Sequence, residues 1–335
     1  MAELCAVVGV GQTKHAACRA DVSIAGLVRE AVDRALADAN ITIADVDAIV
    51  IGKAPDSLEG VAMPELWLAD ALAAHGKPVF RVHTAGSVGG STAIVAAQHV
   101  MAGIHGTVLT IGFEKQSDGN AMWALSVPIP FGMPVHAGAG GYFSPIVRGY
   151  IARSGAPSHI GAMALVLMSE ERADKHAGRK AWVHATSMRS EPTAFAGREQ
   201  VSPVAGEMCA ADLWRKGGIK NPAKEIDVVE MYVPFAWFEP MWLENLGFAP
   251  RNEGWRWVED GVTEMGGSLP VNPSGGVLSS NPIGASGMLR FGEAAMQVMG
   301  KAGEHQIDGA KKAVGHAYGG GSQFFAMWLV SSTKP

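Results

Sequence analysis

Cysteine is scarce in this chain of 335 residues, which has only Cys5, Cys18 and Cys209. Three widely spaced cysteines cannot form a disulfide scaffold, and they cannot supply the four ligands of a structural zinc site. We therefore expect neither a disulfide framework nor a bound metal.

Charge of one sign and long apolar runs are also missing. Charged residues make up 18% of the chain, and the 27 basic and 32 acidic residues give a net charge of −5. A nucleic-acid or anionic-membrane surface needs clustered excess Lys and Arg. No run of 18 apolar residues could span a bilayer, and the N-terminus lacks the pattern of a signal peptide. We expect a soluble cytoplasmic protein that binds no nucleic acid and does not insert into membranes.

Glycine, in contrast, is abundant, with 42 of the 335 residues against roughly 7% in average proteins. The excess gathers in short clusters such as those at 86–90 and 319–321, which is typical of tight functional turns. Apolar runs typical of strands are found at 5–10, 47–52, 80–84, 107–113, 181–186, 225–232 and 312–330, the last as a hairpin. Helical spacing is found at 24–39, 63–74, 91–102, 204–216, 238–246 and 284–299. This alternation predicts an α/β protein with mostly parallel sheets.

The second half of the chain repeats the order of the first. ADVDAIVIG at Ala44 and KEIDVVEMY at Lys224 lie 180 residues apart and hold the same place in each half. A repeat of this size indicates a duplicated domain, which we divide into 1–175 and 176–335. The small-residue helices 91–102 and 284–299 are nearly apolar all round, so we expect both to be buried between two sheets.

Ligands of such proteins bind where loops leave the carboxyl ends of strands and meet helix N-termini. The candidate site is therefore formed by the loops 83–90, 232–235, 274–284 and 316–322.

Four motifs in this order resemble the thiolase superfamily over nearly the whole chain, and in particular its lipid-transfer-protein (sterol-carrier-protein) type. They are HTAGSVGG at His83, EIDVVEMYVPF at Glu225, NPSGGVLSSNPIGASG at Asn272 and GHAYGGGSQ at Gly315. The resemblance is nearest to a subgroup of bacterial steroid catabolism. It implies the thiolase fold, with duplicated βαβαβαββ halves in five αβαβα layers, and acyl-CoA as substrate, with no cofactor beyond the CoA of the substrate.

Every usual catalytic position of the family has changed. At the position of the nucleophilic cysteine of thiolases, the turn holds Ser87 or, as the alternative, Gly86, and Tyr232 takes the place of the histidine in the His-Asp-Cys-Phe motif. Asn281 replaces a second histidine, and the last glycine loop has His316 and Tyr318 instead of an acid/base cysteine. The resemblance also implies a long excursion between the halves. At Gly155–Met163 the chain runs almost directly on, so either the excursion is naturally shortened or the sequence omits a loop.

Each candidate residue has a structural and a functional interpretation. Ser87 lacks an evident base, so it is a small turn residue or, less favoured, a nucleophile. Tyr232 is a core ring or an acid or base, and the same holds for Tyr318. His316 is structural or catalytic, whereas Asn281 marks a turn or stabilises an oxyanion.

Other polar groups are given lesser roles. Ser274, Gly275, Gly276, Gly319 and Gly320 are the candidate substrate-binding residues. Glu114 and Glu239 are interpreted as surface groups or groups behind the site.

Three functions stay open. Retro-aldol cleavage of a β-hydroxyacyl-CoA is preferred because the catalytic cysteines are absent. The alternatives are thiolysis of a 3-oxoacyl-CoA (an acetyltransferase-type activity) and a non-catalytic acyl-CoA-binding subunit. Steroid side-chain aldolases of this family work with a small zinc-ribbon/OB-fold partner of the DUF35 type. We expect such a partner, and a homodimer through an edge strand and the segment 132–145 with Met133, Tyr142 and Phe143.

Overall fold

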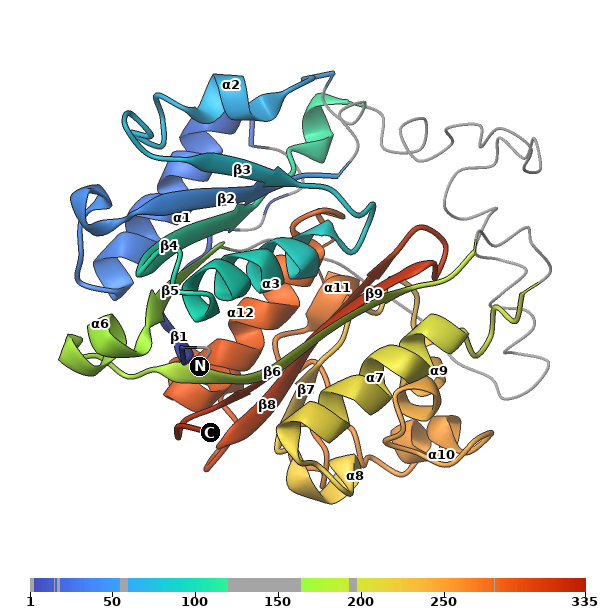
Figure 1. Ribbon diagram of the computed structural model, residues 1–335. Coiled ribbons are helices and arrows are strands. Elements are labelled where there is room, and N and C mark those ends of the chain that lie inside the picture. Colours follow the sequence, from blue (N-terminus) through green and yellow to red (C-terminus); the bar gives the residue numbers. More distant parts are fainter. Residues whose placement is uncertain are drawn as a thin grey trace.

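The computed structural model describes residues 3–14, 16, 19–54, 60–119, 164–192, 198–279 and 281–335 (Figure 1). The first half carries β1 (Cys5–Gly11), α1 (Ile24–Asp38), β2 (Ala48–Gly52), α2 (Pro64–Leu68), β3 (Val79–Val82), α3 (Val88–Met101), β4 (Thr107–Gly112), β5 (Ala164–Ser169) and α6 (Glu170–Lys175). The second carries β6 (Ala181–Ser190), α7 (Val204–Gly217), α8 (Pro222–Glu225), β7 (Val228–Glu230), α9 (Phe238–Asn245), α10 (Gly254–Glu259), α11 (Gly276–Ser279), α12 (Ser286–Met299), β8 (Lys312–Gly319) and β9 (Phe324–Ser331). Short 3-10 turns lie at Ile43–Asp45, Gln116–Asp118 and Gly303–His305.

The described strands form one nine-stranded sheet in the order β3-β2-β4-β5-β1-β6-β9-β8-β7. The two halves join where Ala6 pairs with Trp182 and Val7 with Ala181. Only β2–β3, β2–β4 and β7–β8 are parallel, and the other five neighbouring pairs are antiparallel. The expectation of mostly parallel sheets is therefore wrong. A tight turn makes β8 and β9 an antiparallel hairpin, and β1 and β6 run opposite to the strands beside them.

The duplication is visible in the element order and in matching hydrogen bonds. The first half reads βαβαβαββ, and the second follows it with its third strand reduced to one bridge between Val229 and Val271. Asp47 accepts the backbone N–H groups of 106 and 107, each at 2.9 Å. Asp227, which is 180 residues later, accepts those of 311 and 312 at 2.9 and 2.8 Å. In each half one carboxylate thus joins the strand it precedes to the start of the neighbouring strand.

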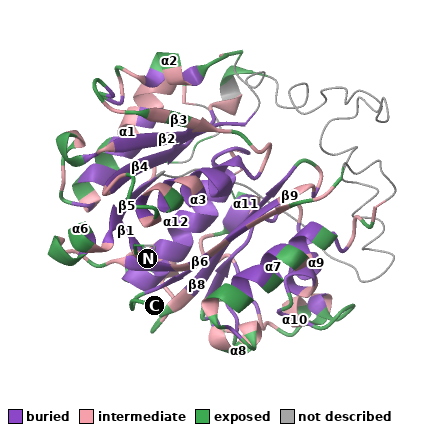
Figure 2. Ribbon diagram, in the orientation of Figure 1, coloured by how far each residue is buried: buried purple, intermediate pink, exposed green. Residues whose placement is uncertain are grey.

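The layers follow the αβαβα order of the thiolase fold. Helix α1 packs on β1 and β5 on one outer side, and α7 packs on β6 and β9 on the other. Helices α3 and α12 pack against each other and against strands of both halves, in the middle of the molecule (Figure 1). Figure 2 shows both as largely buried, which confirms the expected burial. They lie between the strands of the first half and those of the second, but these strands are joined in one sheet and not in two separate ones.

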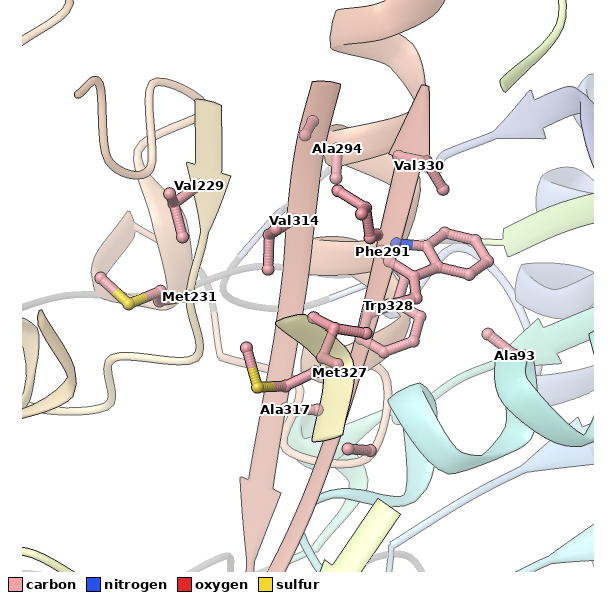
Figure 3. Close-up of a cluster of buried hydrophobic side chains, with 14 of the residues drawn as sticks. Ala93, Val229, Met231, Phe291, Ala294, Val314, Ala317, Met327, Trp328 and Val330 are labelled. Carbon is pink, nitrogen blue, oxygen red and sulfur yellow. The ribbon is translucent and has the colours of Figure 1, made fainter. Parts of the chain in front are cut away.

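The core beside α12 is built from large apolar side chains of three elements (Figure 3). Phe291 of α12 stacks on Trp328 of β9 with ring centroids 4.6 Å apart, and Val314 of β8 is buried nearby. Ala317 points toward the two central helices, because an added side-chain carbon at Gly90 or Gly287 would lie 2.7 Å from its Cβ. This layer holds the end of β8 firmly next to the N-termini of α3 and α12.

Two elements are shorter than the sequence predicts. The helix expected at 63–74 is regular only over Pro64–Leu68, between the positive φ angles of Met63 and Ala73. The strand expected at 225–232 shrinks to β7, because Pro222 begins the short helix α8 directly before it. The division into 1–175 and 176–335 falls at the end of α6 and stays a prediction. Within the described residues, no helix has the length and apolar character that a membrane crossing demands.

The crossing of α3 and α12 depends on Gly89. A Cβ atom at this position would lie 2.4 Å from the backbone nitrogen of Met288 and 2.5 Å from the carbonyl oxygen of Gly284. Backbone cannot move aside as a side chain can, so Gly89→Ala should lower the free energy of unfolding by about 2 kcal/mol or more.

Gly26→Ala in α1 is the matched control, because its Cβ would meet nothing closer than 3.5 Å and alanine favours a helix. Urea unfolding of both variants checks this prediction. Equal stability of the two variants would contradict it.

Candidate functional site

All four loops chosen from the sequence meet at the N-termini of α3 and α12. A Cβ atom on Gly86 would lie 3.2 Å from the carbonyl oxygen of Tyr318 and 3.9 Å from the hydroxyl of Tyr232. One on Gly319 would lie 2.4 Å from the backbone nitrogen of Ser87. Glycine at both positions therefore lets the loop after β3 and the end of β8 come into direct contact, with the Tyr232 hydroxyl beside them.

Tyr232 follows β7 and is only 4% exposed. Its hydroxyl donates toward the side-chain oxygen of Asn281 at 3.1 Å and the carbonyl oxygen of Ile283 at 3.3 Å. Burial raises the pKa of this phenol above its usual value near 10, and the negative charge of Glu114 raises it further. Tyr232 therefore keeps its proton at neutral pH and is a hydrogen-bond donor and potential acid.

Asn281 is held at both its backbone and its side chain. Gln116 donates its side-chain amide to the carbonyl oxygen of Asn281 at 2.8 Å. Ser286, the first residue of α12, donates its hydroxyl to the Asn281 side-chain oxygen at 2.8 Å. Sequence reasoning missed Ser286, although its place in the NPIGASG motif, five residues after Asn281, was a signal that could have found it.

Tyr318 and His316 lie on the same face of β8, as alternation along a strand requires. The Tyr318 ring meets the Tyr232 ring edge to face at 5.2 Å between centroids. His316 is fully buried, 5.7 Å from the Trp242 ring and 5.8 Å from the Phe325 ring. Neither of its ring nitrogens has a hydrogen-bond partner among the described residues, and burial lowers its pKa to about 3. The structure thus brings Tyr318 to Tyr232 but gives His316 no polar contact with the site.

Ser87 precedes α3 and is fully buried. Its hydroxyl donates to the carbonyl oxygen of Thr84 at 2.8 Å and lies 3.0 Å from the Thr84 hydroxyl. Ala85, between them, has the unusual φ of +49°. The serine proton is therefore directed back into its own turn, which is the geometry of a turn residue.

The loop before α11 is fixed by a buried ion pair that the sequence did not reveal. Glu230 and Arg290 are 0% and 2% exposed and form a salt bridge. The Ser274 hydroxyl donates to Glu230 at 2.9 Å and accepts from Arg290 at 2.8 Å. Ser274 is thus occupied by protein groups, and it positions Gly275 and Gly276, whose φ angles are +85° and +61°. Gly320, also proposed as a substrate contact, has a φ of +63° in the turn after β8.

Glu114 is not a surface group as one interpretation had it. It is 5% exposed and pairs with the fully buried Lys53, with 3.4 Å between the Lys53 amine and a carboxylate oxygen. It also accepts the backbone N–H of Ala54. It also lies against Gly284, where a Cβ atom would collide with the carboxylate. Glu114 therefore supports the turn that carries Asn281 from behind.

A cavity of about 520 Å³ lies at the other end of α12, beside Arg179, Lys180 and Lys311. Fourteen residues of helix separate the two ends of α12, which corresponds to about 21 Å. This cavity is therefore remote from the Tyr232–Asn281–Ser286 cluster and takes no part in its chemistry.

Two family models match the chain: the thiolase N-terminal domain at residues 5–129 and the thiolase C-terminal domain-like model at 182–331. The protein belongs to the thiolase superfamily. Within it, the chain is of the sterol carrier protein 2 type.

Individual relatives agree with this placement. The chain is 26% identical over 372 residues to an acetyl-CoA acetyltransferase of Methanothermobacter thermautotrophicus, covering 94% of this chain and 96% of the relative. It is 26% identical over 384 residues to human sterol carrier protein 2, covering 93% and 69%. A solved structure described as an Ltp2-ChsH2(DUF35) aldolase matches with a TM-score of 0.79 and 22% identity, over 100% of this chain and 99% of the other. The shortened excursion expected at Gly155–Met163 lies outside the described residues.

The pH dependence of stability tests whether His316 is buried without a polar partner in the second half. Folding lowers the pKa of His316 from about 6.5 to about 3. As the pH falls through this range, the unfolded chain binds a proton that the folded protein does not, so the free energy of unfolding decreases. Between pH 7 and 5 the wild type should lose about 2 kcal/mol more than His316→Leu.

Urea unfolding at both pH values measures the difference. His75→Leu, at an exposed histidine, is the control and should follow the wild type. A wild-type loss equal to that of His316→Leu would mean that His316 has a polar partner after all.

Proposed function

We propose that this protein binds acyl-CoA thioesters and cleaves the Cα–Cβ bond of a β-hydroxyacyl-CoA by a retro-aldol reaction in lipid or steroid catabolism. The observation that carries the proposal is a protonated, buried Tyr232 hydrogen-bonded to Asn281 at the N-terminus of α12. These groups can stabilise and protonate an enolate. At the thiolase nucleophile position, the Ser87 hydroxyl donates to Thr84 instead.

The reaction consumes only its substrate. A base accepts the proton of the β-hydroxyl, the O–H electron pair forms the new carbonyl bond, and the Cα–Cβ bond breaks. The released pair becomes the enolate of the shortened thioester, whose oxygen is held by the Asn281 amide and the N-terminus of α12. Tyr232 protonates Cα, and the proton taken from the hydroxyl restores Tyr232. The products are an aldehyde or ketone and a shorter acyl-CoA, and no free thiol, oxidant or reductant is needed.

Tyr232 keeps its proton and the pKa of His316 is lowered to about 3, which leaves Tyr318 as our candidate for the base. Tyr318 is as buried as Tyr232, so it would accept the β-hydroxyl proton only while giving up its own. His316 then contributes through packing beneath the Tyr318 ring, with 6.4 Å between centroids. The space that a side chain would take at each of the candidate substrate-binding glycines is filled by neighbouring protein atoms, so in this proposal they contact the substrate through backbone groups. These residues are Gly275, Gly276, Gly319 and Gly320.

The cysteines support a reaction without an acyl-enzyme. Thiolysis needs a thiolate near neutral pH, but Cys5 and Cys209 are fully buried. Burial raises both thiol pKa values, that of Cys209 to about 12. Cys18 lies outside the described residues.

The similarity to an acetyl-CoA acetyltransferase favours thiolysis as the second candidate. The similarity to an Ltp2-ChsH2(DUF35) aldolase supports the first, and it supports a DUF35-type partner. If such a partner carried the catalysis, the chain would be an acyl-CoA-binding subunit, which is the third candidate.

The decisive experiment supplies β-hydroxyacyl-CoA esters, steroid-like ones included, to the protein purified from its native host with any partner that co-purifies. We expect cleavage without added CoA and without inhibition by iodoacetamide. Tyr232→Phe keeps the ring and removes the hydroxyl, and it should lower turnover by roughly 10²–10⁴.

Ser87→Ala is the matched control at the nucleophile position and should stay within about tenfold of the wild type. Two acyl-CoA products that form only when CoA is supplied would favour thiolysis. A chain that binds the esters but shows no turnover with its partner would favour the binding subunit.

We also propose a homodimer through the β3 edge. Strand β3 is the last strand of the sheet, and Arg81 of β3 pairs with Glu65 of α2 at 3.7 Å. Beside this edge, Leu66 and Trp67 are 69% and 70% exposed and Phe80 is 36% exposed. Unpaired edges and large apolar side chains at one end of the molecule are what a two-fold interface covers.

Light scattering should give about twice the 35.0 kDa mass of the chain. Trp67→Glu should shift the protein toward monomer, whereas Met208→Glu, at an exposed methionine of α7, should not. A wild-type monomer at micromolar concentration would refute the dimer. The segment 132–145, expected to cross between subunits, lies outside the described residues.

A further inference from the structure

The side-chain oxygen of Asn281 is shared by two hydroxyl groups. Tyr232 donates to it at 3.1 Å, and Ser286 at 2.8 Å. An amide carries its acceptor and its NH₂ donors on opposite sides. While both hydroxyls bind the oxygen, the NH₂ group must face away from them.

The backbone of Asn281 is held in place, so the side-chain amide is the part that can rotate. Gln116 holds the Asn281 carbonyl at 2.8 Å, and the backbone N–H of Ser286 is bonded to Ile283 at 3.3 Å. Tyr232 alone does not fix the amide, because its hydroxyl has Ile283 as a second acceptor at 3.3 Å and could accept from a reversed NH₂ group. Ser286 is fully buried. Its hydroxyl donates to the Asn281 side-chain oxygen at 2.8 Å and is also in hydrogen-bond contact with the Tyr232 hydroxyl, so it ties the amide to the tyrosine.

We infer that Ser286 is a positioning residue that sets the orientation of the Asn281 amide, so that its NH₂ group and not its oxygen faces the thioester carbonyl. The inference rests on the proposed function, because it gives that NH₂ group an enolate oxygen to bind. A reversed amide would point lone pairs at the developing negative charge. The hydroxyl of Ser286 thus decides whether Asn281 stabilises or repels the enolate.

The role is tested on the enolate itself, through exchange of the α-protons of a saturated acyl-CoA in D₂O, followed by mass spectrometry. Exchange needs a base and an oxyanion donor but no bond cleavage, so it reports on this site whether the full reaction is retro-aldol or thiolytic. Ser286→Ala should lower the exchange kcat by about tenfold with KM unchanged, and Asn281→Ala by roughly 10²–10³.

A double-mutant cycle separates positioning from a structural role. If Ser286 acts through the amide, adding Ser286→Ala to Asn281→Ala should cost nothing further. The control is Ser331→Ala, which removes the hydroxyl of another buried serine at the far end of β9 and should leave exchange unchanged. A Ser286→Ala penalty that persists undiminished in the Asn281→Ala background overturns the inference, as does a Ser286→Ala variant with wild-type exchange.

A second measurement does not depend on activity. In protein labelled with ¹⁵N-asparagine, the side-chain NH₂ signals of Asn281 are those that Asn281→Ala removes. Ser286→Ala should shift or double these signals, because the amide can then take both orientations, and Ser331→Ala should not. Unchanged signals overturn the inference. If the Asn281 signals shift in Ser286→Ala but the wild type shows no α-proton exchange, the positioning role stands and the proposed function is wrong.

Discussion

The close crossing of α3 and α12 is the constraint on which the rest of this structure depends. Backbone meets backbone at Gly89 and Met288, with no room for a side chain between them. That contact brings the N-termini of two buried helices together, each entering from its own half of the duplicated chain. The loops before the helices, around Ser87 and Asn281, must then lie side by side. A site at this point has two helix N-termini in a dry interior, where they favour developing negative charge.

Within that frame, the hydrogen-bond partners of each hydroxyl define the chemistry. Ser87 donates inward to Thr84, so an attack by its oxygen would leave a buried carbonyl without its partner, at a cost of about 1–3 kcal/mol. Tyr232 donates toward Asn281, and burial keeps its proton in place. The site is thus poor in nucleophiles and rich in proton donors, the reverse of what an acyl-enzyme requires.

Much of the fold was predictable because local sequence patterns determine it. The 180-residue repeat, the two apolar helices and the glycine turns are local patterns, and they place most of the site. The direction of β5, β6 and β9 was not predictable, because strand pairing depends on contacts between distant residues such as Ala6 and Trp182. The buried Glu230–Arg290 and Lys53–Glu114 pairs were missed for a related reason. A charged residue in a sequence looks solvated until its partner, 60 and 61 residues away in these two pairs, is seen beside it.

The candidate residues likewise differ in how far the sequence could place them. Tyr232 and Asn281 came from different motifs, and their hydrogen bond joins positions 49 residues apart. His316 looked equally suited by type and position, yet strand alternation places it behind Tyr318, among aromatic rings. Two residues along a strand share a face but lie about 7 Å apart, which is enough to separate a ring at the rim of a site from one in its core. Residue type and spacing therefore select candidates, and the interior packing of β8 against α9 decides which of them can reach a substrate.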